Sequence, residues 1–186
     1  MKDRRSIRTK KVIRNAFLEL LNDKDINKIT VAEISRIADL GRGTFYLHYK
    51  DVYDLYEQIE NDLFEQLSQF YNASFPSNDP VDLLLFMEKT TEYIYDNKLL
   101  ITLLFHPGRN LLTLQKFKDF FHIKISEELR ANMPTDHPIS EYDEVETTFT
   151  VCGVVGVLEK WVSRGMEQSP KQISHLIHLI LMKIED

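Results

Sequence analysis

The segment from Thr30 to Lys50 restricts the fold more than any other part of the chain, because it holds two short helix patterns around a tight turn. Thr30 and Glu33 have the spacing of a capping box, in which each side chain accepts a hydrogen bond from the other residue's backbone amide. Apolar residues then recur at helical spacing until Asp39, a residue type that tolerates the left-handed backbone of a turn. The pattern predicts two helices joined by a tight turn.

The second helix of this pair follows Gly41, which can serve as its N-cap. Phe45 and Tyr49 are four residues apart and are expected to face inward. The remaining positions carry small, polar and aromatic residues where a buried helix would carry aliphatic ones. Such a face suits a DNA groove, because Arg can bind guanine or phosphate, and Thr and Tyr can contact phosphate or a thymine methyl group. The predicted DNA-binding residues of this segment are Thr30, Arg42, Gly43, Thr44, Tyr46, Leu47, His48 and Lys50.

The next helix begins immediately after this segment. Asp51 is its expected N-cap, with Asp54 at the third helical position. The first backbone amides of that helix, together with Lys50, are expected to form a seat for a DNA phosphate.

The charge distribution supports the same interpretation. The whole chain has a net charge of −6, which taken alone argues against a nucleic-acid partner. However, residues 1–50 carry 12 Lys or Arg and 6 Asp or Glu, a net +6, and residues 51–186 carry 11 and 23, a net −12. A basic head on an acidic body concentrates phosphate attraction at one end. A charge run is usually a solvated helix face. The basic run here directly precedes the motif, so we expect at least two of its residues to contact phosphate and to make binding strongly salt-dependent. The run consists of Arg4, Arg5, Arg8, Lys10, Lys11 and Arg14, of which Arg5 and Arg8 are the predicted contacts.

The string GRGTFYLHYKDVYDL, residues 41–55, resembles the recognition helix and following helix start of the TetR family of bacterial transcriptional regulators. The resemblance runs from about Ile7 to Leu67 and includes the TVAEI opening at Thr30. It implies a three-helix DNA-binding head, a C-terminal body that binds a small-molecule effector, and a homodimer on an inverted-repeat operator in double-stranded DNA.

Three positions depart from the pattern of that family. Asp39 stands where a Gly is customary, and Gly41 where a Ser or Asn cap is customary; both replacements suit the required backbone. Val52 stands where many members carry a Lys, which removes one expected phosphate contact and leaves more of that role to Lys50.

Helical patterns cover nearly the whole chain, and no segment favours a strand. We therefore predict an all-α fold of about nine helices, in which residues 1–50 form the helix-turn-helix domain and residues 51–186 the ligand-binding and dimerisation bundle. A helix from about residue 51 connects the two. The expected helices outside the hairpin cover residues 7–22, 52–71, 81–97, 98–105, 111–132, 140–164 and a final segment opened by Pro170.

The last two helices carry the dimer prediction. Their apolar residues fit either an ordinary core or, as the resemblance implies, a four-helix bundle built with a second copy of the chain. A two-fold dimer of this kind places two recognition helices about 34–36 Å apart, one turn of DNA. The predicted interface residues are Gly153, Gly156, Lys160, Ile173, Ile177, Ile180 and Leu181.

The resemblance also implies an effector pocket in the body. Aromatic core packing is the commoner role for any single candidate, and the residues point to no ligand class. Cys152 is the single cysteine, which excludes an internal disulfide and a multi-cysteine metal site, and its apolar neighbours predict a core position. The candidate lining residues are Tyr93, Phe105, Phe117, Phe121, Phe149 and Cys152, with His106 and His122 beside them.

These features predict a dimeric, sequence-specific DNA-binding regulator, a repressor whose DNA affinity is changed by a small-molecule effector. The alternative is a regulator or activator that acts through a protein partner bound to the C-terminal domain. An enzyme is not expected, because the chain has no Gly-rich phosphate loop, metal-ligand spacing or nucleophile elbow. No cofactor or metal is predicted. Without a secretion signal or an apolar run of about 20 residues, the expected location is the cytoplasm.

Overall fold

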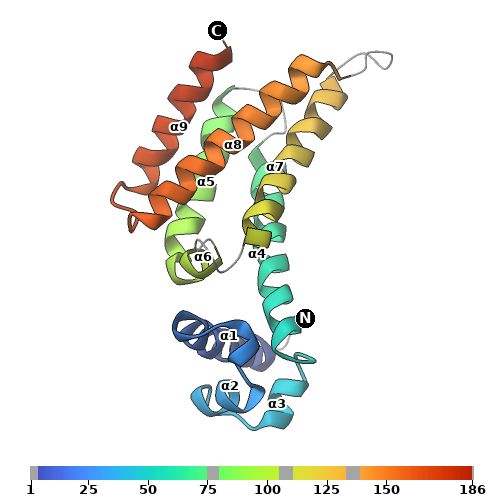
Figure 1. The fold of residues 1–186 in the computed structure, drawn as a ribbon, viewed down its shortest axis with the longest axis vertical. Helices are drawn as coiled ribbons and strands as arrows, with labels where there is room; N and C mark the ends of the chain where they lie inside the picture. The colour runs from blue at the N-terminus through green and yellow to red at the C-terminus, as the bar shows by residue number, and fades with distance from the viewer. Residues whose placement is uncertain (1–3, 75–79, 105–110, 133–138, 186) are drawn as a thin grey trace. The chain divides into compact units, whose positions relative to one another are not determined.

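The computed structural model describes residues 4–74, 80–104, 111–132 and 139–185 (Figure 1). Over these ranges the regular structure is helical and contains no strand, which confirms the predicted all-α fold. The helices are α1 (Arg4–Asp23), α2 (Val31–Ile37), α3 (Arg42–Tyr46), α4 (Val52–Ser74), α5 (Pro80–Asp96), α6 (Lys98–Leu104), α7 (Leu111–Asn132), α8 (Glu141–Ser163) and α9 (Pro170–Glu185), with one 3-10 turn, η1 (Ile26–Lys28).

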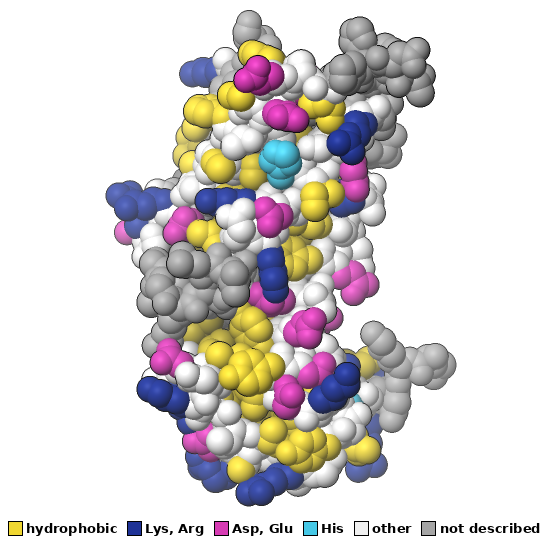
Figure 2. Space-filling view, turned by 45° about the vertical axis from the view of Figure 1, so that its right-hand side comes forward, with side chains coloured by type: hydrophobic (Ala, Val, Ile, Leu, Met, Phe, Trp, Pro, Cys, Tyr) yellow, Lys and Arg dark blue, Asp and Glu magenta, His cyan; other side chains and the backbone are white. Residues whose placement is uncertain are grey.

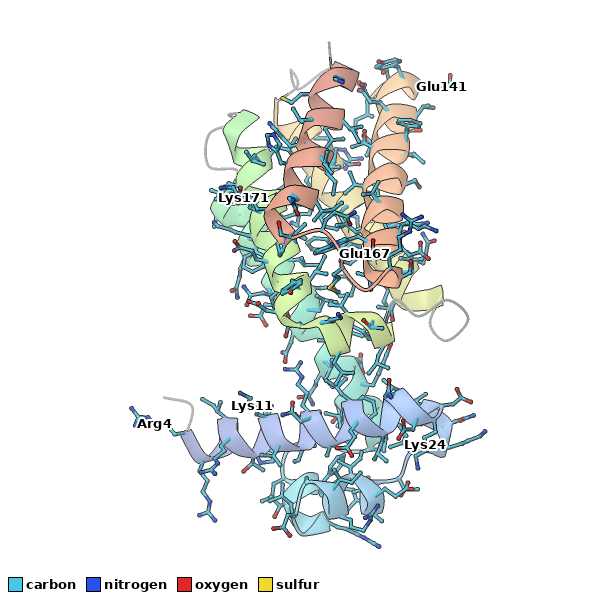
Figure 3. The ribbon with its side chains drawn as sticks, turned by 90° about the vertical axis from the view of Figure 1, so that its left-hand side faces the viewer. Arg4, Lys11, Lys24, Glu141, Glu167 and Lys171 are labelled. Carbon is cyan, nitrogen blue, oxygen red and sulfur yellow. The ribbon has the colours of Figure 1, made fainter. Side chains whose placement is uncertain are left out.

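The chain forms two compact units, Met1–Glu65 and Gln66–Asp186, called here the head and the body. In the head, α1 packs against α2 and α2 against α3, and Figure 3 shows α1 running from Arg4 toward Lys24 above the two shorter helices. Each helix buries one apolar face, and the fully buried side chains include Ile13, Phe17, Ile34, Phe45 and, from the first half of α4, Leu55, Ile59 and Leu63.

In the body, α5 packs against α9, and α8 packs against both α7 and α9. Helices α8 and α9 run antiparallel, with Glu141 at the end of α8 that lies away from Glu167 and the connecting turn (Figure 3). That turn passes through two left-handed residues, Gly165 and Met166, at φ 77° and 61°. The Trp161 indole donates a hydrogen bond to the Gln168 carbonyl across 3.0 Å and so closes the turn.

Most helix bounds lie within three residues of the predicted ones, and α9 opens at Pro170 as predicted. Three details differ. Helix α1 begins at Arg4 rather than Ile7, η1 was not predicted, and α3 ends at Tyr46 rather than continuing to Tyr49. The compact units divide after Glu65, within α4, so the first turns of α4 pack as part of the head. A functional boundary near residue 50 stays a prediction.

Candidate nucleic-acid interface

The capping box predicted at the start of α2 is present. The Glu33 amide donates to Thr30 Oγ1 across 3.3 Å, and the Thr30 amide donates to Glu33 Oε2 across 3.0 Å. Lys24 Nζ donates to Glu33 Oε1 at 2.6 Å, and this bond, ahead of those from Thr30, lowers the pKa of Glu33 to about 2. Because the Thr30 hydroxyl also donates to Glu33, its hydrogen is not available to a phosphate in this arrangement.

The turn between α2 and α3 has the backbone that its residues predict. Asp39 adopts the left-handed conformation at φ 51°, where Asp is one of the better-tolerated non-Gly residues. The Leu40 amide donates to the Ser35 carbonyl at 2.9 Å, which closes the turn. Gly41 is the extended N-cap of α3, with no side chain to accept a hydrogen bond. The first two departures from the family pattern are therefore compatible with the hairpin.

Helix α3 separates buried anchors from exposed side chains as predicted. Phe45 and Tyr49 are 0% and 6% exposed, and their ring centroids lie 5.5 Å apart. On the other side, Tyr46 is 57% and Leu47 80% exposed. Of the other predicted contacts, Arg42, Gly43 and Lys50 are exposed, whereas Thr44 and His48 are half-buried. An exposed Leu beside a Tyr and an Arg suits a groove that offers thymine methyl groups and phosphates.

The start of α4 is capped by its own carboxylates. Asp51 Oδ1 accepts from the amides of Tyr53 and Asp54, at 2.8 and 2.9 Å. Asp54 Oδ2 in turn accepts from the Lys50 amide at 2.7 Å, the main reason that the pKa of Asp54 is lowered. Because Asp51 already occupies these amides, the expected phosphate seat reduces to the exposed Lys50 side chain. Val52 is buried and cannot supply the contact of the customary Lys.

Basic side chains accompany this segment. Arg5 and Arg8 are exposed on α1, as the prediction requires of phosphate contacts. Figure 2 shows Lys and Arg side chains around the lower end of the head, interspersed with hydrophobic ones.

The structure divides the predicted dimer residues into two groups. Gly153, Gly156, Lys160 and Ile180 are exposed, together with the apolar residues Val145, Phe149, Leu176 and Leu179. Ile173, Ile177 and Leu181 are only 6%, 2% and 8% exposed. These three lie in the core of the subunit itself, because α9 packs against α5, and so they are not surface residues of an interface. The exposed apolar residues of α8 and α9 are called the α8–α9 face below.

The predicted pocket residues are also divided. Phe117 and Phe121 are buried, with their ring centroids 4.9 Å apart. Tyr93 is half-buried, and its ring centroid lies 5.7 Å from that of Phe70. His122 Nδ1 lies 3.5 Å from Ser126 Oγ. Phe149 and Cys152 are exposed on α8, so their assignment to the interior was wrong. Phe149 instead borders a shallow surface depression of about 400 Å³, shared with Glu144, Val145 and Thr148. Phe105 and His106 lie outside the described residues.

The described residues offer neither a membrane-spanning helix nor a metal site. None of their helices combines the length and apolar character needed to cross a membrane. Among the same residues, no group of three His, Cys, Asp or Glu side chains is arranged to hold a metal ion.

Comparison with known proteins places the chain in a family. A family model described as "Transcriptional regulator C-terminal region", TetR_C_8, matches residues 82–183, more than half of the chain. YxbF of Bacillus subtilis, an uncharacterized HTH-type transcriptional regulator, is 24% identical over 89% of this chain, which spans 42% of that protein's length. DhaS of Lactococcus lactis, a dhaKLM operon transcriptional activator, is 24% identical over 98% of this chain and 94% of its own.

A solved structure extends the comparison to the whole fold. FadR from Bacillus subtilis in complex with stearoyl-CoA superposes with a TM-score of 0.61 at 16% identity, over 91% of this chain and 96% of that one. At this identity the likeness concerns the fold alone. The helix-turn-helix geometry, the matched C-terminal region and the shared fold agree, and the chain belongs to the TetR family of transcriptional regulators.

Proposed function

We propose that the protein is a dimeric, sequence-specific DNA-binding regulator that acts in the cytoplasm. The main supporting observation concerns α3 and the residues directly after it. Tyr46 and Leu47 are exposed there, whereas Phe45 and Tyr49 are buried in the head. The helix is anchored from behind and offers Arg42, Tyr46 and Leu47 to a major groove. The net +6 of residues 1–50 supplies the phosphate attraction that holds such a helix on DNA.

The proposed dimer uses the α8–α9 face. Phe149 is 66% exposed, Val145 64%, Ile180 53% and Leu176 50%, so apolar area remains uncovered on both helices. Gly153 and Gly156 are exposed on α8, and a Cβ added at either would meet no atom within 4 Å, so the backbone is open to a partner helix. A second copy seated on this face pairs two recognition helices for an inverted repeat.

The proposed regulation is repression relieved by a small molecule bound in the body. Aromatic rings line the interior between α4, α5 and α7, where Tyr71 packs on Phe86 at 5.5 Å and Phe86 on Phe121 at 5.8 Å. The hydroxyls of Ser74 on α4 and Thr90 on α5 are buried without a hydrogen-bond partner. A ligand with polar groups that reach these hydroxyls would be favoured, because an unpaired buried polar group is costly. The complex of FadR with stearoyl-CoA supports an effector of some kind.

The alternative is a regulator or activator that works through a protein partner, and the similar protein DhaS, an operon transcriptional activator, supports its activating form. Transcription in vitro from a bound promoter separates the two. A repressor lowers the transcript level by itself, whereas the alternative requires a second protein and raises it.

DNA binding is tested first, by fluorescence anisotropy on genomic promoter fragments at two salt concentrations. Arg42→Ala and Tyr46→Ala are each expected to weaken binding to the selected inverted repeat by about tenfold or more, since each removes a base or phosphate contact. Arg130→Ala and Tyr95→Ala remove the same side-chain types from exposed positions in the body and should bind normally. Equal binding to all fragments, with Arg42→Ala and Tyr46→Ala indistinguishable from wild type, contradicts the proposal.

The dimer is tested by light scattering. Ile180→Glu places a charge on the α8–α9 face and should convert the protein to a folded monomer. Ile123→Glu is the matched control, because Ile123 is 55% exposed on α7, outside that face. An Ile180→Glu variant that stays dimeric excludes this face as the interface.

The effector is tested by thermal shift with stearoyl-CoA and shorter acyl-CoA thioesters as the first probes. A binding ligand raises the unfolding temperature of the body and, for a repressor, releases the operator. Thr90→Val should weaken that shift while leaving DNA binding in the absence of ligand unchanged. If the ligand raises the unfolding temperature of wild type and of Thr90→Val equally, Thr90 is ruled out as a ligand contact.

A further inference from the structure

Two polar contacts, one helical turn apart, join α1 to the first half of α4. Arg14 Nη2 pairs with Asp62 Oδ2 at 2.9 Å, and Lys10 Nζ lies 3.5 Å from Gln58 Oε1. The two donors are four residues apart on α1 and the two acceptors four residues apart on α4, so each pair shares one helix face. These four residues are called the clasp below.

One residue of the clasp, Lys10, contacts Tyr49, which follows α3 directly before Lys50. Lys10 Nζ lies over the Tyr49 ring, 5.5 Å from its centroid. Burial is the main reason that the pKa of the Tyr49 phenol is raised; the charge of Arg14 opposes this rise, and those of Asp62 and Asp54 add to it. Tyr49 holds α3 in turn, because its amide donates to the Phe45 carbonyl at 3.0 Å and the two rings pack together.

A second connection runs from the clasp to the next residue, Lys50. Gln58 Nε2 donates to both carboxylate oxygens of Asp54, at 3.1 and 3.2 Å. Asp54 in turn accepts the hydrogen bond from the Lys50 amide. Gln58 therefore contacts Lys10 directly and the backbone of Lys50 through the Asp54 carboxylate.

We propose that the clasp positions α3 and Lys50 for DNA, and that Asp62 is a positioning residue for DNA binding although it is a carboxylate in a basic head. The inference rests on the proposed DNA-binding function. For the change in operator affinity when Asp62 is removed, it predicts the opposite direction from that expected of charge repulsion alone. If Asp62 acted only through its charge, its removal would reduce repulsion of phosphates and tighten every DNA complex. If Asp62 holds Arg14, and with it the α1–α4 packing that places Lys10 over Tyr49, its removal weakens the specific complex alone.

The test compares Asp62→Asn with wild type on the operator duplex and on a random-sequence duplex of the same length and salt concentration. Operator affinity should fall by about threefold, the scale of a partly exposed ion pair, because the side chains of Arg14 and Asp62 are 32% and 59% exposed. Random-sequence affinity should stay equal or rise. The specificity ratio therefore falls, which neither a lost charge nor a uniformly weakened phosphate contact produces.

Matched variants isolate the contact. Glu57→Gln removes the same charge from an exposed position of α4 outside the clasp and should not lower the ratio. Arg14→Asp and Asp62→Arg should each lower it, and the double variant, which restores an opposite-charge pair, should recover most of the loss. Thermal unfolding of each variant shows that the head remains folded.

The outcomes separate the two proposals. If Asp62→Asn binds the operator as wild type does or more tightly, or if the exchanged pair gives no recovery, the clasp has no positioning role and the DNA-binding function stands. If the wild-type protein does not distinguish operator from random sequence, the proposed function fails, and the role of the clasp fails with it.

Discussion

The head and the body are both built from amphipathic helices, but they differ in which helix faces carry apolar residues. In α3 of the head, Phe45 is fully buried whereas the next residue, Tyr46, and the C-cap Leu47 are 57% and 80% exposed, so one short segment has a buried anchoring face and an exposed face. In α8 and α9 of the body, apolar residues occupy both faces, with Val155 and Ile177 buried and Phe149 and Ile180 exposed. Sequence periodicity identifies a single apolar face, but it does not tell a core from a partner surface when both faces are apolar.

The largest expected effect comes from a charge on the buried face of α9. Ile177→Glu should destabilise the body by more than about 4 kcal/mol, because it buries an unpaired carboxylate in a well-packed core. The fluorescence of Trp161, the single Trp and a buried residue of the body, reports the unfolding midpoint in denaturant. The control is Ile180→Glu, three residues away on the exposed face. Equal unfolding midpoints for Ile177→Glu and Ile180→Glu would contradict the assignment of one buried and one exposed face to α9.

A cavity in the head should be the next largest effect. Phe45→Ala should cost about 3–5 kcal/mol, since Phe45 is fully buried beneath Tyr46 and Tyr49. The loss should appear in circular dichroism as an earlier transition, while the Trp161 signal of the body keeps its midpoint. Leu47→Ala, on the exposed side of the same segment, should leave stability within about 0.5 kcal/mol and still weaken DNA binding. A single transition shifted for both probes would mean that head and body do not unfold separately.

A smaller effect of opposite sign is expected in the body interior. Thr90→Val replaces a buried hydroxyl without a hydrogen-bond partner by a methyl group of similar shape. The variant should gain about 1 kcal/mol, because the desolvation cost of the hydroxyl disappears. Denaturant unfolding followed at Trp161 measures the change. A loss of stability of similar size would show that the hydroxyl has a favourable partner, such as bound water.

The smallest effect concerns pH and the capping box of the head. The pKa of Glu33 is about 2 in the folded state, below its ordinary value of 4.5. Its contribution is therefore present above pH 4.5 and disappears as the pH falls toward 2. Glu33→Gln should lower the unfolding temperature of the head at neutral pH, and the difference from wild type should shrink over this acidic window. Glu19→Gln, at an exposed position on α1, should show no such window.

The predictions from sequence were most successful where the determining interactions are local. The capping box of Thr30 and Glu33, the left-handed Asp39 and the inward Phe45 all depend on neighbours within a few residues. The same holds for the Asp51 cap, but sequence spacing did not show that this carboxylate would occupy the amides expected to bind phosphate.

The predictions that were wrong all concern residues whose burial depends on packing between helices far apart in the sequence. Ile177 and Cys152 were assigned to the wrong face because the positions of α5 and α7, against which α9 and α8 pack, are not encoded in the spacing of those helices. The clasp escaped prediction for the same reason, since Arg14 and Asp62 are 48 residues apart. The predicted DNA contacts and the role of the α8–α9 face stay predictions until binding is measured.

The 48-residue separation within the clasp has a consequence for synthesis on the ribosome. Residues 1–50 contain every predicted DNA contact, but the head also buries Leu55, Ile59 and Leu63 of α4 and receives Asp62 from it. A nascent chain that has exposed only its first 50 residues therefore lacks part of its own core and one partner of its ion pair. We therefore expect the head to complete its core only when the chain to Glu65 has emerged, and an excised 1–50 fragment to be less stable than a 1–65 fragment.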